Sequence, residues 1–436
     1  MSHPSFSQFS HRTIRSLLSL TIVLGSLQVN AQEKMFLHLT SHSTLGAPIG
    51  STDSIWFSSD STTAFFQIGD TLVQHLLTEI DSITFGAPSD TVFIDYNGGW
   101  FSVINPYAFE GLDVAVSGAD AIVTSANDTL DVVYCLSGSS SDGMFKLYSE
   151  TPYTLVLNGV NLTNSDGPTI NIQAKKSGEI VQIGGTSNTL TDGAVYADPP
   201  SGEDQKGAFF SEGALQFSGS GALTLTASGD GIDGDEGEVM ISGGTVEIEV
   251  PGDACKGIKT DLAINLNGGT VNILNSGDAV LEASGAGYDP SYCTAVKSDD
   301  DIVVNGATVT IESTGMAGKG FSADDGIKSE YLIETDNATL SITSSVEGLE
   351  APFININSGT VEIKSSDDCI NTTFGLGGEL DDGSLLQITG GLISLNTTGG
   401  DGIDSNGDIL FTGGVYSGGT FKKSFTINSK ITQVTF

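Results

Sequence analysis

Arginine is almost absent from this chain of 436 residues, with Arg12 and Arg15 as the only two. Both lie in an N-terminal segment that we expect to be removed. The formal net charge is −38, and loss of a segment with two arginines and no acidic residue takes it to −40. Nucleic acid and anionic membranes require a basic surface, so this charge argues against both as partners. Without arginine the remaining chain could not form bidentate hydrogen bonds from guanidinium groups to carboxylates. An acidic polymer would therefore need a metal ion to bridge it to the protein.

Cysteine is also scarce, with four residues at positions 135, 255, 293 and 369. Such a small number does not suit a disulfide framework, and the spacing does not suit a zinc site. We expect buried free thiols, with one disulfide as the alternative. Cys255 is expected to point into the core, because it stands where other copies of a repeat have Ile, Leu or Val.

Long apolar runs are limited to residues 17–27, which follow basic residues and precede the small residues of a cleavage site at Val29–Ala31. This pattern predicts an export signal at residues 1–31, too short to be a stable membrane anchor. The absence of a cysteine before Cys135 argues against a lipid at the cleavage site. We therefore expect a secreted protein, extracellular or at the cell surface, without membrane insertion.

Glycine is abundant, with 56 residues, and much of it belongs to a recurring phrase of an acid, a small residue and an apolar residue. The phrase reads GDGID at Gly229–Asp233 and again at Gly400–Asp404. Copies recur 23 residues apart from Asp230 to Asp253 and 25 apart from Asp253 to Asp278, which is the range of solenoid repeats. One acid per turn is therefore expected to fall in one column on the outside of a stack.

A second marker of the form Gly-Gly-Thr-Val-x-Ile follows each phrase, as in GGTVEIEV from Gly243. Its alternation of apolar and polar residues predicts strands, such as Val239–Ile241 and Thr245–Val250. Short strands in each turn would stack in parallel on those of the next turn. The predicted fold class is all-β, a parallel β-helix of about a dozen rungs over residues 91–436, with a C-terminal cap.

Residues 32–90 are expected to form a small β-hairpin module of their own. The sequences Asp53–Phe57 and Asp81–Phe85 echo each other, and each follows an alternating stretch, Met35–Leu39 or Ala64–Ile68. A terminal unit of a solenoid must cover an open core, so the module is predicted to be a cap. The alternative is that it joins the rod to a partner, such as a cell-surface protein.

A column of carboxylates about 5 Å apart would repel itself unless a cation were present. Oxygen ligands in irregular geometry favour calcium over magnesium. The alternative is that Asp and Gly serve only as turn formers. The candidate calcium ligands are Asp230, Asp233, Asp253, Asp278, Asp299, Asp300, Asp325, Glu347, Glu350, Asp368, Asp401 and Asp404.

The ordered succession of phrases resembles a known family. Tyr153–Leu162, Ser165–Asn171 and Asn188–Gly193, followed by the GDGI and GGTVxI copies, look like the secreted carbohydrate-binding domain proteins that bind cellulose and pectin. The resemblance covers roughly residues 91–419. It implies a right-handed parallel β-helix, similar in shape to pectate lyases, that holds calcium ions.

An enzyme of this shape would cleave a uronate polymer by β-elimination. Calcium would make the C5 proton more acidic, and a basic side chain would remove it. Without arginine, the base would be a lysine on or near the acidic column: Lys256, Lys259, Lys297 or Lys328. We expect these lysines instead to neutralise carboxylates.

Sugar-stacking aromatics are few, since neither Trp56 nor Trp100 lies in the repeats. Tyr288, Tyr292 and Phe374 are the candidates, and the alternative is that they cover the side of the rod. The carbohydrate-contacting set is completed by Lys256, Lys297 and Lys328. The predicted function is non-catalytic, calcium-dependent binding of a cellulose- or pectin-like polysaccharide, with a lysine-based lyase and a structural or adhesion rod as alternatives.

Overall fold

A computed structural model describes residues 9–10, 34–48, 52–86, 90–126, 128–285, 287–323, 332–375, 381–418, 421–422, 426–427 and 433–435. The regular elements of this part of the chain are all strands, which confirms the prediction of an all-β protein. The same residues contain no helix with the length and apolar character needed to cross a bilayer.

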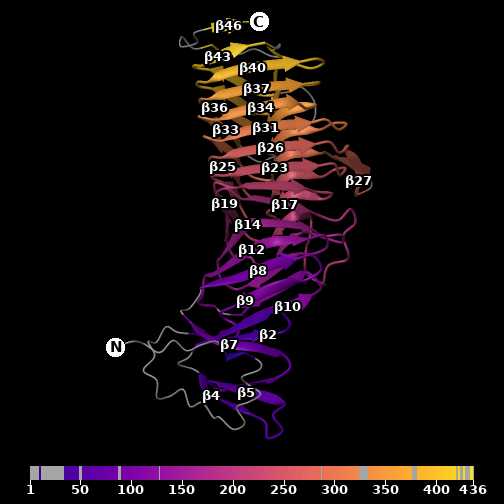
Figure 1. The fold of residues 1–436 in the computed structure, drawn as a ribbon. Helices are drawn as coiled ribbons and strands as arrows, with labels where there is room; N and C mark the ends of the chain where they lie inside the picture. The colour runs from indigo at the N-terminus through magenta and orange to yellow at the C-terminus, as the bar shows by residue number, and fades with distance from the viewer. Residues whose placement is uncertain are drawn as a thin grey trace, which may run out of the picture.

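Most strands belong to three long ladders that run along a rod (Figure 1). The first ladder is parallel throughout. Its strands are β8 (Thr91–Asn97), β12 (Val132–Ser140), β14 (Tyr153–Thr163), β16 (Gly178–Gln182), β19 (Leu215–Gly219), β22 (Val239–Ile241), β25 (Ile264–Leu266), β30 (Ile302–Asn305), β33 (Leu332–Asp336), β36 (Phe353–Ile356), β39 (Leu385–Ile388), β42 (Asp408–Phe411) and β45 (Thr426–Ile427).

The second ladder starts from the C-terminal half of β14, which pairs with β17, and is also parallel. It continues through β17 (Ser187–Thr191), β20 (Ala222–Thr226), β23 (Thr245–Val250), β26 (Thr270–Asn275), β31 (Thr308–Ser313), β34 (Thr339–Ser344), β37 (Thr360–Ser365), β40 (Leu392–Thr397), β43 (Val415–Ser417) and β46 (Gln433–Thr435).

The third ladder begins with an antiparallel pair, β10 and β11, and is parallel from β11 onward. Its strands are β10 (Leu112–Ser117), β11 (Asp120–Ser125), β13 (Phe145–Ser149), β15 (Ile170–Ile172), β18 (Gly207–Ser211), β21 (Asp230–Asp233), β24 (Lys256–Thr260), β29 (Thr294–Ser298), β32 (Lys319–Ala323), β35 (Glu347–Ala351), β38 (Ile370–Thr372), β41 (Ile403–Ser405) and β44 (Phe421–Lys422).

One turn of the chain contributes one strand to each ladder, so β21, β22 and β23 are followed by β24, β25 and β26 in the same order. The predicted strands at Val239–Ile241 and Thr245–Val250 are β22 and β23. Apolar residues of successive turns stack in register inside the rod; Val246 lies opposite Val271, which lies opposite Val309, and all three are fully buried. Large parallel sheets with one apolar face inside are consistent with a parallel β-helix.

Residues 34–48 and 52–86 lie at one end of the rod and β43 and β46 at the other (Figure 1). Strand β2 pairs antiparallel with both β3 and β7, and β4, β5 and β6 form a separate three-stranded sheet. Strand β3 also pairs with β9, which ties this unit to the rod. The strands are β2 (Lys34–Leu39), β3 (Ser43–Pro48), β4 (Thr52–Phe57), β5 (Thr63–Ile68), β6 (Thr71–Leu76), β7 (Ile80–Gly86) and β9 (Phe101–Asn105).

The two echoed sequences both become strands, β4 and β7, and the module has an apolar cluster of its own around Met35, Phe66 and Ile80. A short strand β1 (Phe9–Ser10), inside the expected leader, pairs antiparallel with β7. The export signal and the domain boundaries stay predictions.

The register around Cys255 differs from the prediction. Ile258, not Cys255, lies opposite Ile232 and fills the core, and Cys255 is only partly buried against it. The chain turns at Ala254, whose φ of 59° places it in the left-handed region, so strand β24 begins only at Lys256. The sequence pattern aligns Asp253 with Asp230, whereas the structure aligns Ile258 with Ile232.

Candidate functional site

The expected single column of acids on the third ladder is therefore wrong. Asp253 and Asp278 lie outside it. After Asp230 the column carries lysine and threonine, whereas its last three positions are all acidic. Read along the rod, it contains Asp230, Lys256, Thr294, Lys319, Glu347, Asp368 and Asp401. A second column contains Asp233, Lys259, Lys297, Ser322, Glu350, Asn371 and Asp404.

Several acids instead join one turn to the next, because their carboxylates accept backbone N–H groups from the following turn. Asp230 Oδ1 accepts from Lys256 at 2.6 Å. Asp253 accepts from Asp278 at 2.9 Å, and Asp278 accepts from Met316 at 2.7 Å. The same bond is made by Asp192 to Ser228, by Asp301 to Leu332 and by Asp368 to Asp401. Charged acceptors make strong hydrogen bonds, so these acids stabilise the stack directly.

Asp233 is the most deeply buried of the predicted ligands, with no exposed surface. Its Oδ1 accepts the N–H of Asp235 at 2.8 Å, and its Oδ2 has no hydrogen-bond partner among the described residues. Burial, together with the neighbouring carboxyl of Asp230, raises the pKa of Asp233 to about 7. Burial also raises the pKa of Asp230. These two buried carboxyls are among the least solvated of the acids predicted as ligands.

Lysines neutralise part of the acidic surface, as was expected for Lys297. Lys319 lies 3.0 Å from Glu347 and also pairs with Glu350, and all three side chains are less than one-fifth exposed. Lys297 lies 2.9 Å from Asp299. Despite burial, which disfavours its charge, the two glutamates raise the pKa of Lys319.

The remaining predicted ligands do not gather into one place. Among the residues that the structure describes, no group of three or more His, Cys, Asp and Glu side chains is arranged to hold a metal ion. Asp325 and Lys328 lie outside the described residues. Asp300 lies beside Asp299 at a partly exposed turn, Asp401 precedes strand β41, and Asp404 lies within it. The described carboxylates thus do not form a ready-made calcium cage.

The aromatic candidates have three different settings. Tyr288 is 72% exposed on a hairpin of β27 (Val280–Ser284) and β28 (Gly287–Ser291) that projects from the rod (Figure 1). The ring of Tyr292 has the Lys319 ammonium 4.2 Å from its centroid. Phe374 is buried, edge-on to Phe353. Only Tyr288 therefore offers an open ring face for stacking on a sugar.

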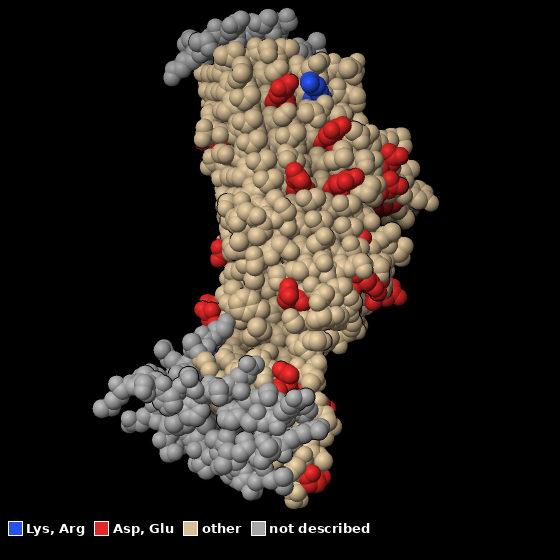
Figure 2. Space-filling view, in the orientation of Figure 1, with Lys and Arg blue, Asp and Glu red and all other residues tan. Residues whose placement is uncertain are grey.

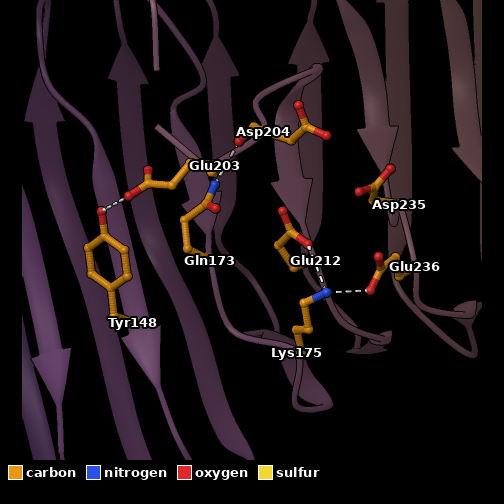
Figure 3. A pocket seen from close by; sticks show the side chains of 9 residues that line it. Tyr148, Gln173, Lys175, Glu203, Asp204, Glu212, Asp235 and Glu236 are labelled. Carbon is orange, nitrogen blue, oxygen red and sulfur yellow. Dashed lines mark hydrogen bonds and ion pairs between the residues drawn. The ribbon is translucent and has the colours of Figure 1, made fainter. Parts of the chain in front are cut away.

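An acidic hollow of about 480 Å³ lies over β13, β15, β18 and β21 (Figure 3). Tyr148 donates to Glu203 at 2.7 Å, Gln173 donates to the main-chain oxygen of Asp204 at 2.7 Å, and Lys175 lies 2.6 Å from Glu236. The full lining is Tyr148, Gln173, Lys175, Gly202, Glu203, Asp204, Glu212, Asp235 and Glu236. The contacts of Glu203 and Asp204 hold the 198–206 loop against the rod. The excess of carboxylates makes the hollow unfavourable for an anionic polymer.

A second hollow, of about 340 Å³, has a different chemistry and is called here the hydroxyl groove. It follows the C-terminal ends of β31, β34, β37 and β40, so it crosses consecutive turns of the rod. Hydroxyl groups dominate its lining, which is Ser313, Thr314, Gly315, Thr343, Ser344, Ser345, Val346, Lys364, Ser365, Ser366, Asn396 and Thr398. The lining contains no acidic residue, whereas most of the charged side chains on the face shown in Figure 2 are acidic.

The backbone under the hydroxyl groove is fixed by bonds between turns. Ser366 N–H donates to Ser345 O at 2.9 Å, and Thr398 N–H donates to Ser365 O at 3.1 Å. Some hydroxyls serve the scaffold, since that of Ser365 donates to Asp367 O at 2.8 Å. Thr314 and Thr398 are exposed. Turns about 4.8 Å apart present these groups at intervals comparable to the length of one pyranose unit.

Sequence reasoning missed both hollows. The hydroxyl groove consists of Ser and Thr residues just beyond the second-marker strands, where they read as ordinary turn residues. Their repetition after Ser313, Ser344 and Ser365 was the available signal. The acidic hollow depends on a loop that folds back over the rod, and the sequence gives no comparable sign of it.

The chain is similar to other proteins over part of its length. A protein from Acetivibrio thermocellus, described as a carbohydrate-binding domain-containing protein, is 26% identical over 147 residues, which are 32% of this chain. The chain matches about half, 51%, of that relative's length. A solved structure, the polysaccharide lyase-like protein from C. thermocellum in a gadolinium derivative, has 16% identity and a TM-score of 0.40 over 78% of this chain and 97% of its own. That likeness is too low to assign a fold or an activity.

A family model described as carbohydrate-binding domain-containing protein matches residues 117–369 and 289–429. The two matches together cover well over half of the chain. They include the acidic hollow, the hydroxyl groove and the hairpin of β27 and β28. The chain belongs to the family of carbohydrate-binding domain-containing proteins.

Proposed function

We propose that this protein is a secreted, non-catalytic binder of extracellular polysaccharide, with a cellulose- or pectin-like polymer as its ligand. The observation that carries the proposal is the hydroxyl groove, because a strip of hydroxyl and amide groups across consecutive turns suits the repeated hydroxyl groups of a sugar chain. Lys364, at one side of the groove and about half exposed, lies 3.9 Å from the equally exposed Glu362, and a uronate carboxylate could replace this loose ion pair. The proposal includes a right-handed winding with about a dozen turns.

The absence of catalysis is supported by the state of the buried lysines. The carboxylates of Asp233 and Asp230 raise the pKa of Lys259 against the effect of burial, and glutamates do the same for Lys319. A lysine that stays protonated cannot accept the proton that a β-elimination must remove. A lyase would therefore need a base other than Lys259 or Lys319.

Calcium binding is proposed because the protein has a large negative net charge. The excess of acidic residues favours a cation at the surface, and a divalent ion could bridge the protein to an anionic polymer. Because the described carboxylates do not form a cage, no step of binding is assigned to calcium here. Export, and a role for the N-terminal module in contacts with surface proteins, belong to the same proposal.

Replacing hydroxyls in the groove tests the function. Thr314→Val combined with Thr398→Val removes two exposed hydroxyl groups while keeping side-chain shape. Two hydrogen bonds at about 0.5–1.5 kcal/mol each correspond to roughly a 5- to 150-fold weaker affinity. The assay is retention on insoluble cellulose and in gels containing polygalacturonate, with calcium or with EGTA.

A matched control exists on two strands that border the groove. Thr308→Val with Thr339→Val removes exposed hydroxyls from the opposite ends of β31 and β34. This variant should bind as the natural protein does. Equal binding by both double variants would reject the groove as the site, and absence of binding by the natural protein would reject the function.

A further inference from the structure

Cys255 and Cys293 lie side by side on consecutive turns of the third ladder. Lys256 of β24 pairs in register with Thr294 of β29, so the residues just before them, the two cysteines, are neighbours as well. Parallel strands lie about 4.8 Å apart. That spacing falls inside the range of about 4.4–6.8 Å between the Cα atoms of disulfide-bonded cysteines.

The two sulfur atoms also approach the same small space beside Gly252. Cys293 Sγ lies 3.4 Å from Gly252 O, and a Cβ atom added to Gly252 would stand 3.0 Å from Cys255 Sγ. The backbone N–H groups of Ala254 and Cys255 point at Cys293 Sγ and oppose the effect of burial on its pKa. The sulfur of Cys293 is thus in contact with the backbone of Cys255 itself.

We propose that Cys255 and Cys293 form a disulfide that joins these two turns, although both are thiols in the structure. The oxidant is a low-molecular-weight disulfide. One thiolate attacks a sulfur of the oxidant and releases one of its thiols, and the second protein thiolate then displaces the other. The protein loses two protons and two electrons, and the oxidant is reduced to two thiols.

The other two cysteines have no cysteine beside them. Cys135 lies in register with Phe93 and Val156. Cys369 directly precedes Ile370, which lies in register with Leu349 of the preceding turn of the rod. The sequence permits several pairings of four cysteines, and the register of the third ladder selects one.

The position of this pair suggests what the bond does. Between the two cysteines the chain forms β24, β25 and β26 and then the projecting hairpin of β27 and β28. Cys293 follows the hairpin directly, where the chain returns to the rod. The disulfide would fix the base of the hairpin that carries Tyr288.

Oxidation should occur while the chain folds. Burial raises the pKa of both thiols, that of Cys255 to about 12, so attack on an oxidant is slow once the rod has closed. The test therefore refolds the full chain in a mixture of reduced and oxidised glutathione, with reduced glutathione alone as the control. Free thiols are then alkylated in denaturant and the protein is mapped by non-reducing peptide mass spectrometry.

The expected result is one cross-linked peptide pair containing Cys255 and Cys293, with alkylated Cys135 and Cys369. Reduction should lower the melting temperature of the natural protein by several degrees and leave that of Cys255→Ala with Cys293→Ala unchanged. Alkylation of Cys255 and Cys293 in the oxidised sample, or a cross-link that includes Cys135 or Cys369, would overturn the proposal. Because it concerns only thiols, its failure would leave the proposed polysaccharide binding untouched.

Discussion

The buried carboxyl of Asp233 should make the protein less stable as the pH rises from about 4 to 7. In the folded state its pKa is about 7, against 3.8 for an ordinary aspartate. Between these values the folded chain holds a proton that the unfolded chain has lost. Stability from a raised acid pKa is therefore present at low pH and falls as the pH approaches 7.

The size of the effect follows from the shift. One pKa unit corresponds to about 1.4 kcal/mol, so the rise from pH 5 to pH 7 should cost about 2–3 kcal/mol through this group. Asp233→Asn removes the titration but keeps an oxygen that can accept the N–H of Asp235. The variant should therefore lose less stability between pH 5 and pH 8 than the natural protein, by about 2–3 kcal/mol.

The assay is urea unfolding at several pH values in EGTA, so that a bound cation cannot contribute. The decisive quantity is the difference between the two pH profiles, because any fixed cost of the amide cancels. Parallel profiles would show that Asp233 titrates as an ordinary aspartate. In millimolar calcium the comparison also reports on a cation at this pair, since stabilisation of the natural protein alone would place calcium there.

Two other substitutions test the packing of the rod. Lys319→Met should destabilise the protein by about 3–5 kcal/mol, because it leaves Glu347 and Glu350 without their counter-charge. Lys175→Met, at a 67% exposed side chain, should have little effect in the same unfolding assay. Similar losses in the two variants would contradict the burial argument. Gly315→Ala should lower the melting temperature sharply, because its Cβ would stand 1.7 Å from the carbonyl oxygen of Gly277. Gly99→Ala, in open space, should not, and a tolerated Gly315→Ala would mean that the turns are not stacked this closely.

Much of the fold could be predicted from the sequence because period-2 apolar patterning survives in every turn. Val246, Val271 and Val309 belong to recognisable copies of one marker and stack as the copies suggested. The third ladder was harder to predict, since its strands are short and follow turns of variable length. Ile258 could have been recognised in the sequence KGIK. The acid of GDACK, however, matched the repeat more strongly and placed Cys255, three residues before Ile258, at the core position.

The candidate site could be predicted less well, because its chemistry depends on which side chains meet between turns. An aspartate that accepts an N–H from the next turn looks, in sequence, like an aspartate that holds an ion. Asp278 and Asp368 make that hydrogen bond, and Phe374, expected as a sugar contact, packs on Phe353 instead. Hydroxyl residues after strands are common, so the groove became visible only when four turns were placed side by side.

The most direct test of the central claim is size-exclusion chromatography of a polysaccharide after incubation with the protein and calcium at pH 7 to 10, with ultraviolet and refractive-index detection. Polygalacturonate and a soluble cellulose derivative serve as ligands. The proposed function predicts that the protein elutes together with the polymer and that the polymer keeps its length without a rise in ultraviolet absorbance. Shortened chains with absorbing unsaturated ends would show a lyase, and separate elution from every polymer would leave a structural rod.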